Sequence, residues 1–485
     1  MKLRILFLVA YLFLATTAKP QSTINDTITR NLSSALSSFA KNGMLSGNVL
    51  VAQDNKIVFH ESFGLANYEW KIANTLETKM YIASISKQFT STLILRLVQE
   101  GLLELNTPIV NYIPQLSSKH FEKITIHQLL SHTSGLPRRI FFEQEELRFE
   151  HTDSEKIEKI DEFPLLFEPG SDFSYSNIGY YLLHLITEAV TNKKFESLVE
   201  NKLLKPIGLE HTGFMNNSSI VENMASGYSI IAGYPTIPEF SDISNSIGAG
   251  GMYSTTHDLY LWDQALRNHI ILDSIHTEKL YVQNKEHYGY GWKIKNLSKK
   301  ENELNRRVEH NGDGRGFASN FTRYLESNFV VIILGNHDYI ERSLVLTYII
   351  RILNDLPVKP VVSVANGYYK QLLEKNIDFE NIKSQLKIDK EKREALDIPN
   401  YMDFFNQGSK LYNSGRKEEA LNYFRFMIHL SPDNYLGYFA LGQHYLQSGQ
   451  IEEAKKYLML SLERKPNDQN IIKLINETDA NNKRN

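Results

Sequence analysis

Hydrophobic residues with helical spacing alternate along this chain with shorter β-rich runs. Ile85, Phe89, Leu93 and Leu97 recur every four residues, which predicts a helix with a buried face that ends near Gly101. The stretch KITIHQLLSHTSGLP predicts a short helix that stops before its glycine and proline. Similar patterns predict helices over 26–41, 176–190, 254–268 (with Ser254 or Thr255 as its cap) and 344–353.

β-rich runs lie at both ends of the first 358 residues. The stretch GNVLVAQDNKIVFHESFGLAN, residues 47–67, predicts a hairpin that turns at Asp54–Asn55. Further strands are predicted over 289–296, 318–325 and 328–335. The last of them, FVVIILGN, is continuously apolar, as a central strand requires. Two stretches show neither the helical nor the strand period of hydrophobic residues. They are a charged, aromatic, lid-like excursion over 138–168 and a loop-rich region over 214–247.

Strands at both ends with helices between them predict one α/β (α+β) domain over 22–358. The stretch DLPVKPVVSV then leaves this domain through two prolines, and 359–400 is expected to be a linker with helical segments.

A repeat follows the linker. Gly408, Gly415, Ala420 and Pro432 recur 34 residues later as Gly442, Gly449, Ala454 and Pro466. This period, with small residues at helix contacts and proline at the end, is typical of the tetratricopeptide repeat. We therefore expect an all-α domain over 401–480, with repeats at 401–434 and 435–468 and a capping helix at 469–477. Such repeats bind a protein partner or brace the neighbouring domain, and the sequence leaves both roles open.

The N-terminus has the layout of a secretory signal peptide. Lys2 and Arg4 precede an apolar run from Ile5 to Ala15, and small residues follow up to Ala18. The alternative is an uncleaved anchor, but the run is short for a membrane span. We expect cleavage after residue 18, export to the periplasm or the extracellular space, and no stable membrane span in the mature protein.

Composition narrows the function classes. Hydrophobic residues make up 42% and charged residues 22%, and the net charge is −3. These values describe an ordinary globular protein and disfavour a nucleic-acid partner. Because the chain has no cysteine, thiolate catalysis and cysteine-ligated metals are excluded. No metal or cofactor is expected: the histidines of RNHIILDSIH and GNHD fit turn or core positions better than a metal site.

Ser84 and Lys87 are the first chemically informative pair. Residues three apart share a helix face, so the two side chains are expected to lie side by side. A serine hydroxyl needs a base to become a nucleophile, and a lysine can be that base only if its pKa falls. Burial and the positive end of a helix both lower a lysine pKa. The alternative is a solvated lysine beside a capping serine.

Two further groups lie later in the chain. Tyr175 and Asn177 come just before a predicted helix, where a tyrosine can carry a proton and an asparagine can bind an amide. His310 and Gly312 belong to HNGDGRGF, whose glycines would let a substrate approach a strand edge. For Tyr175 and Asn177 the alternative is ordinary loop structure, and for the segment at His310 it is a simple glycine-rich hairpin.

Taken in order, these groups resemble the Ser-x-x-Lys, Tyr-x-Asn and Lys/His-Thr-Gly motifs of the penicillin-recognising serine hydrolases. The chain is most similar to the class C β-lactamase-like branch, which includes D,D-carboxypeptidases, D-aminopeptidases and esterases. The resemblance covers about 30–355 and extends to ASISKQFT, ITIHQLLSHTSGLP, FEPGSDFSYSNIGYYLL, LLKPIGLEHTGF and GAGGMYSTTHDLYLW. It implies an antiparallel sheet flanked by helices, together with a helical subdomain.

The resemblance also implies roles. Ser84 would be the nucleophile, Lys87 its base and Tyr175 the proton shuttle to the leaving group. Asn177, His310 and Gly312 would bind the substrate. The oxyanion hole would be formed by the backbone N–H groups of Ser84 and Asp313.

Two departures from the motifs bear on the substrate. Asn311 stands where threonine or serine is usual, and the third motif begins with His310 rather than lysine. A neutral histidine suits a substrate carboxylate less well than a lysine does, which disfavours a potent β-lactamase.

The sequence therefore predicts an exported serine hydrolase that forms an acyl-enzyme on Ser84. Its substrate is a D-amino-acid peptide, a β-lactam or a small ester. The alternative is a catalytically silent module that binds peptidoglycan fragments and signals through its repeats.

Overall fold

The computed structural model describes residues 21–141, 144–296, 306–358, 361–363, 365–374, 376–392, 396–397 and 399–482. The expected signal peptide, residues 1–18, lies outside the described residues.

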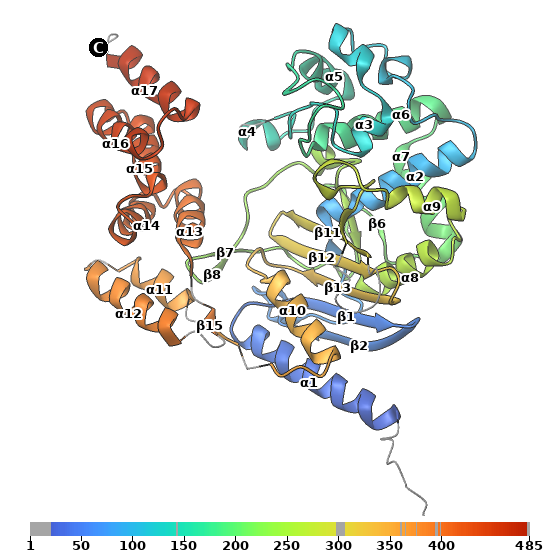
Figure 1. Ribbon diagram of the computed structural model, residues 1–485, viewed down its shortest axis with the longest axis horizontal. Helices are drawn as coiled ribbons and strands as arrows, with labels where there is room; N and C mark the ends of the chain where they lie inside the picture. Colours follow the sequence, from blue (N-terminus) through green and yellow to red (C-terminus); the bar gives the residue numbers. More distant parts are fainter. Residues whose placement is uncertain are drawn as a thin grey trace, which may run out of the picture.

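A six-stranded antiparallel sheet forms the centre of the larger part of the chain (Figure 1). Its strand order is β10-β11-β12-β13-β1-β2. The strands are β1 (Gly47–Gln53), β2 (Lys56–Phe63), β10 (Lys293–Asn296), β11 (Arg306–Gly314), β12 (Phe317–Tyr324) and β13 (Phe329–Gly335). The turn between β1 and β2 falls at Asp54 and Asn55, which both have positive φ, as a tight hairpin turn requires.

Successive side chains of a strand point to opposite faces of this sheet, and each face packs in a different hydrophobic core. Val49 and Val51 of β1 pack in one core, with α1 (Gln21–Lys41) and α10 (Arg342–Leu353). Leu50, between them, packs in the other core, with α2 (Lys87–Gln99) and α8 (Thr256–Arg267). β13 is buried along its whole length, so the prediction of a central strand for FVVIILGN is confirmed.

The helical subdomain packs beyond α2 (Figure 1). Its helices are α3 (Ile126–Leu130), α4 (Gln144–Leu147), α5 (Asp153–Asp161), α6 (Asn177–Thr191), α7 (Phe195–Val199) and α9 (Ser274–Leu280). Thr255, one of the two expected caps, accepts a hydrogen bond from the Asp258 N–H at the start of α8. Short strands complete this part: β3 (Leu65–Asn67) with β4 (Ile72–Ala73), β5 (Met80–Tyr81) with β9 (Met252–Ser254) and β6 (Gly213–Phe214), and β7 (Ser229–Ile231) with β8 (Tyr234–Thr236).

The glycine-rich segment around His310 forms a hairpin: it ends strand β11 at Gly314, which pairs with Phe317 of β12. One expectation needs correction. The region 138–168 is not wholly irregular, because α5 lies in it behind a capping box formed by Thr152 and Glu155.

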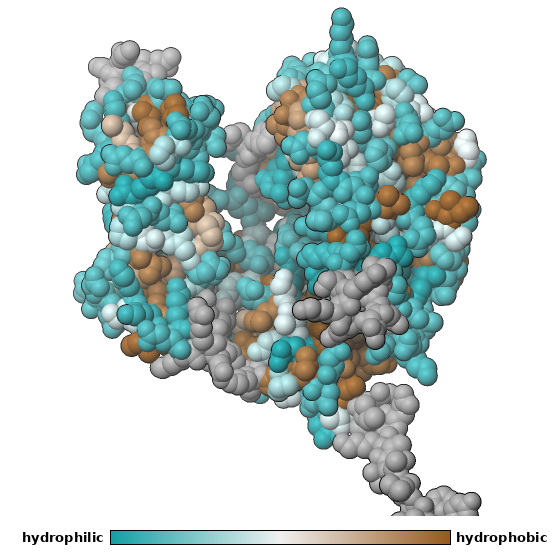
Figure 2. Space-filling model, in the orientation of Figure 1, coloured by the Kyte–Doolittle hydropathy of each residue, from teal (hydrophilic) through white to brown (hydrophobic). Residues whose placement is uncertain are grey.

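The C-terminal part is helical apart from one short parallel pair, β14 (Val362–Ser363) with β15 (Leu396–Asp397). Its helices form a column beside the sheet domain (Figure 1): α11 (Ala365–Gln371), α12 (Phe379–Lys392), α13 (Tyr401–Asn413), α14 (Lys417–Leu430), α15 (Tyr435–Gln447), α16 (Ile451–Arg464) and α17 (Gln469–Asn482). On the face shown in Figure 2, apolar residues occur in small separate groups on both parts.

The β7–β8 hairpin joins the two parts. The Ala232 N–H at its turn donates to Gln407 Oε1 of α13 at 2.8 Å, and Ile231 and Ala232 share a core with Tyr369 and Phe404. The helical column is therefore packed against the sheet domain rather than only tethered to it.

Candidate active site

Ser84 lies in a short 3-10 turn, η1 (Ala83–Ser86), that leads directly into α2. Ala83, just before it, has a φ of +46°, a left-handed conformation that residues with a Cβ seldom adopt. This bend carries the chain from β5 into η1 and presents Ser84 to the end of β11. Strain of this kind is concentrated at functional sites.

Lys87 lies one turn after Ser84, and its Nζ is 3.2 Å from Ser84 Oγ. The lysine side chain is fully buried. Its Nζ also donates to Asn177 Oδ1 at 2.9 Å and to the Ala249 carbonyl at 2.7 Å. These two oxygens take the two N–H bonds of a neutral amine, which leaves the lone pair for the Ser84 hydroxyl.

The charge state of Lys87 follows from its surroundings. Burial, and secondarily the positive charge of Arg138, lower the Lys87 pKa well below its usual value. No carboxylate among the described residues lies within ion-pair distance of its Nζ, so nothing there stabilises the ammonium form. The arrangement therefore favours an uncharged amine beside a hydroxyl.

Tyr175 completes a group of three around the serine. Its ring centroid is 5.0 Å from Lys87 Nζ. Burial raises the Tyr175 pKa, and the Ser84 side chain is close enough to lower it only in part, so the phenol keeps its proton at neutral pH. Tyr175 is thus suited to relay a proton rather than to act as a standing phenolate base.

Asn177 is the first residue of α6, so its position is set by the helix start. The Ser176 side chain caps α6 by accepting a hydrogen bond from the Gly179 N–H. The Asn177 N–H donates to the Arg138 carbonyl at 2.9 Å. The helix start thereby places the Asn177 amide against Lys87.

His310 of β11 is buried and uncharged. Its Nδ1–H donates to the Asn311 carbonyl at 2.7 Å, and its Nε2 accepts from the Tyr288 hydroxyl at 3.0 Å. Burial lowers the His310 pKa to about 3. The His310 ring therefore stays neutral at physiological pH.

The edge of β11 beyond His310 faces η1. Pairing with β10 starts at Glu309, which lies opposite Lys293, so β10 leaves the later residues of β11 uncovered. Gly312 approaches η1 so closely that a Cβ there would lie 2.1 Å from the Ile82 carbonyl oxygen. Glycine is therefore required at this position to bring the strand edge to Ser84.

The residues on either side of Gly312 are polar and exposed. Asn311 Oδ1 accepts a hydrogen bond from Asn320 Nδ2 at 2.8 Å. The Asp313 carboxylate forms an ion pair with Arg342 Nη1 at 2.7 Å. The third motif therefore offers a neutral amide and a compensated carboxylate rather than a free cation.

The sequence did not predict three aromatic or imidazole side chains of the site, those of His132, Tyr180 and Tyr288. His132 is fully buried, and its ring centroid is 4.3 Å from that of Tyr175 and 4.6 Å from that of Tyr288. Tyr180 donates to the Leu130 carbonyl at 3.0 Å. His132 lies in the SHTSG stretch quoted above, which was a signal for it, whereas Tyr288 has no local motif.

The family of the chain follows from comparison with known proteins. A model of the beta-lactamase family matches residues 28–354. The chain belongs to the beta-lactamase family. A tetratricopeptide-repeat model matches residues 411–476, which confirms the repeat assignment.

Relatives in the family have similar sequences over most of this region. Protein flp of Staphylococcus aureus (strain MRSA252) is 28% identical over 341 residues, which cover 67% of this chain and 66% of that protein. Penicillin-binding protein 4* of Bacillus subtilis is 27% identical over 336 residues, 64% of this chain and 72% of that protein. The chain thus spans slightly less than two thirds of the length of Protein flp.

A solved structure supports the fold. The penicillin-binding protein of Bacillus halodurans is 26% identical, with a TM-score of 0.54, and the match covers 68% of this chain and 98% of that one. The predicted fold class, a beta-lactamase-like domain followed by a helical repeat region, is confirmed.

A cleft of about 280 Å³ adjoins the catalytic group. Apolar and charged side chains share its wall, among them Tyr81, Phe141, Asn177, Tyr181, Asp313 and Arg315. Asn177 and Asp313 border both this cleft and the surroundings of Ser84, so a substrate bound here would lie against the nucleophile.

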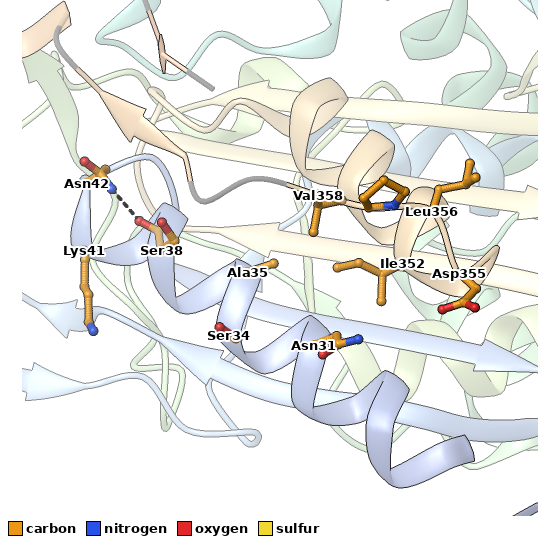
Figure 3. Close-up of a pocket in the computed structure, with 11 residues that line it drawn as sticks. Asn31, Ser34, Ala35, Ser38, Lys41, Asn42, Ile352, Asp355, Leu356 and Val358 are labelled. Atoms are coloured by element: carbon orange, nitrogen blue, oxygen red, sulfur yellow. Dashed lines mark hydrogen bonds between the residues drawn. The ribbon is translucent and has the colours of Figure 1, made fainter. Parts of the chain in front are cut away.

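A larger cavity, of about 700 Å³, lies between α1 and the end of α10 (Figure 3). Its polar wall includes Ser38, Asn42 and Asp355, and Asn42 Nδ2 donates to the Ser38 carbonyl at 2.8 Å. It lies on the face of the sheet away from Ser84 and pairs no base with a nucleophile, so it is a weaker candidate for catalysis.

The described residues lack both a metal-binding cluster and a membrane-spanning helix. They contain no group of three or more histidine, aspartate or glutamate side chains arranged to hold a metal ion. They also contain no helix that is both long and apolar enough to cross a membrane.

Proposed function

We propose that this protein is an exported serine hydrolase that works through an acyl-enzyme on Ser84. One observation carries the proposal: a dehydrated amine, Lys87 Nζ, lies 3.2 Å from Ser84 Oγ. A buried lysine with no carboxylate partner among the described residues costs stability, so its presence points to a functional role. Removing the proton from a serine is a role that suits a neutral amine.

The acylation step follows from this geometry. Lys87 takes the hydroxyl proton as Ser84 Oγ attacks the substrate carbonyl carbon. The carbonyl oxygen becomes an oxyanion, which the backbone N–H groups of Ser84 and Asp313 would stabilise by about 3–4 kcal/mol per donor. The tetrahedral intermediate then collapses. The bond to the leaving group breaks as that group takes the proton through Tyr175, and the acyl group stays on Ser84.

Deacylation reverses the proton flow. A water molecule gives a proton to the Lys87–Tyr175 pair and attacks the acyl carbon, and Ser84 Oγ leaves and regains a proton. Because burial keeps the Tyr175 phenol neutral, it relays protons between the reacting atoms and Lys87. Asn177 would hold the substrate amide and orient Lys87, and His310 and Gly312 would shape the strand edge along which the substrate lies.

The motifs, and relatives that are named penicillin-binding proteins, support the proposed substrate class. D-amino-acid peptides, β-lactams and small esters all present a carbonyl that a serine can acylate. The neutral His310 and Asn311 disfavour a potent β-lactamase. Export after cleavage of residues 1–18 is part of the proposal and is in keeping with relatives that are named penicillin-binding proteins.

The domain boundaries, 22–358, 359–400 and 401–480, remain predictions. We further propose that the repeats offer a surface to a protein partner. Their contact with the β7–β8 hairpin supports an additional role as a brace for the hydrolase domain.

An active-site label tests the proposal. The purified protein is treated with a fluorescent fluorophosphonate and with a fluorescent penicillin, beside the Ser84→Ala variant. Labelling of the wild type but not of the variant supports an acyl-enzyme on Ser84. No labelling of a folded wild type by either probe contradicts it and favours the catalytically silent binding module.

A further inference from the structure

An exposed arginine lies over the proton relay. Arg138 Cζ is 5.4 Å from the centroid of the Tyr175 ring, and its own carbonyl holds the Asn177 N–H. Its backbone is therefore tied to the catalytic group while its guanidinium faces solvent. No described carboxylate lies within 4 Å of this guanidinium.

Three other polar groups near Ser84, those of His310, Asp313 and Arg315, are neutral or engaged. His310 is fixed as a neutral ring between Tyr288 and the Asn311 carbonyl. Asp313 is paired with Arg342 at 2.7 Å. The Arg315 guanidinium donates to the Ser241 carbonyl and lies 5.6 Å from the Phe240 ring centroid. Arg138 is thus a cation at the mouth of the site without an anionic partner among the described residues.

We propose that Arg138 is a specificity-determining residue that binds an anionic group, a carboxylate, on the leaving-group side of the substrate. The inference rests on the proposed function, because that function places the leaving group on the side of Tyr175. A guanidinium presents a planar set of donors that matches a carboxylate. The third motif of this chain lacks a cation, and Arg138 supplies one from the opposite wall.

Arg139, the next residue in the chain, is also a cation but lies in a different part of the site. Arg139 lines the cleft with Phe141 and Tyr181, whereas Arg138 lies over Tyr175. The two arginines have the same charge but meet different parts of a bound substrate. Arg139→Ala therefore tests whether this neighbouring cation of the cleft, rather than Arg138, binds the carboxylate.

Two aryl esters form the test: 4-nitrophenyl acetate, and its analogue with a carboxylate on the leaving phenol, 3-carboxy-4-nitrophenyl acetate. Both are assayed with the full chain at low and high salt. Arg138 also lowers the Lys87 pKa, so its loss changes both rates, and the readout is the ratio of the two kcat/KM values. We expect Arg138→Ala to lower the carboxylate-to-neutral ratio by about tenfold, since a charge-assisted pair is lost.

Arg138→Lys should retain part of the preference, and Arg139→Ala should lower the ratio less than Arg138→Ala does; an equal or larger fall in Arg139→Ala would overturn the assignment to Arg138. The wild-type ratio should fall at high salt, because an exposed ion pair is screened. An equal loss on both esters in Arg138→Ala would overturn the inference while the hydrolase proposal stands. A wild type that Ser84-directed probes label but that prefers the neutral ester would overturn it as well. If no probe labels Ser84, the proposed function fails, and this inference fails with it.

Discussion

Lys87 is unusual because its position costs stability. A fully buried amine has lost its hydration, and its partners are two carbonyl-type oxygens and a hydroxyl rather than a carboxylate. The cost is lowest when the amine is neutral, which is the form that can accept the serine proton. The same feature that disfavours Lys87 in a stability argument thus favours it in a catalytic one.

Replacing Lys87 should abolish acylation. We expect Lys87→Ala and the volume-matched Lys87→Met to lower the acylation rate at least about a thousandfold, because general-base assistance is lost. In the wild type, the rate should fall as pH drops through the lowered Lys87 pKa, since protonation removes the base. Stopped-flow acylation with a chromogenic ester measures both effects. Near-normal turnover in Lys87→Met would contradict the role of Lys87.

Replacing Tyr175 should affect rate more than stability. Tyr175→Phe removes one hydroxyl beside Ser84 and leaves the ring against His132. We expect kcat to fall by about a hundredfold or more, with little change in Tm. Steady-state kinetics and thermal melts on the same samples check this. A drop in Tm as severe as the loss in rate would indicate a structural tyrosine instead.

At the scale of elements, strand β11 decides whether the site can form. The sequence marked no strand over its first residues, and glycine is rare inside strands. Pairing with β12 along the whole segment outweighs that preference, since strand formation depends on tertiary context. The close approach of Gly312 to Ile82 joins the sheet edge to the start of α2.

Gly312→Ala tests this contact. The added Cβ would lie 2.1 Å from a backbone oxygen, so β11 and η1 would have to move apart. We expect kcat/KM to fall at least about a hundredfold, since a displacement of this kind misplaces the reacting groups. Overpacking should also lower the free energy of unfolding by about 1–3 kcal/mol.

Gly367→Ala in α11 is the matched control, because its Cβ would meet no atom within 4 Å. It should retain full activity and stability. Unchanged kinetics in Gly312→Ala would show that the strand edge does not have to lie this close to Ser84.

At the scale of the whole molecule, the helical repeats pack against the sheet domain. Lys410 of α13 forms an ion pair with Asp338 at 2.9 Å, and the same carboxylate oxygen accepts from the Ile230 N–H at 3.0 Å. The β7–β8 hairpin is thus held between strand β13 and α13. The loop that follows this hairpin contributes Ser241 and Asp242 to the cleft wall.

Deleting residues 365–485 should therefore destabilise the hydrolase domain. The deletion uncovers Ile231 and Ala232 and leaves Asp338 without Lys410. Loss of about 2–3 kcal/mol of burial and hydrogen bonding would lower Tm by roughly 5 °C or more. The double variant Gln407→Ala, Lys410→Ala, which keeps the repeats, should show a smaller shift in the same direction.

Calorimetry and the ester assay on each protein separate the two roles of the repeats. A deletion that leaves Tm unchanged would contradict the brace and leave partner binding as the role of the repeats. Activity at low temperature should survive in every case, because Ser84, Lys87, Tyr175 and the β11 residues all precede the deletion.

The sequence by itself determined the local chemistry and the order of elements. Helical periodicity put Ser84 and Lys87 on one face, β-rich runs marked five of the six main strands, and the 34-residue period gave the repeats. These are short-range properties, because neighbours in the chain are neighbours in a helix or hairpin.

Only the tertiary structure decided the charge state of each titratable side chain and which side chains surround it. Burial of Lys87 and His310, the cluster around His132 and Tyr288, and the free cation of Arg138 all arise where distant segments meet. A pKa depends on the dielectric and the charges contributed by such segments, and no local spacing encodes them.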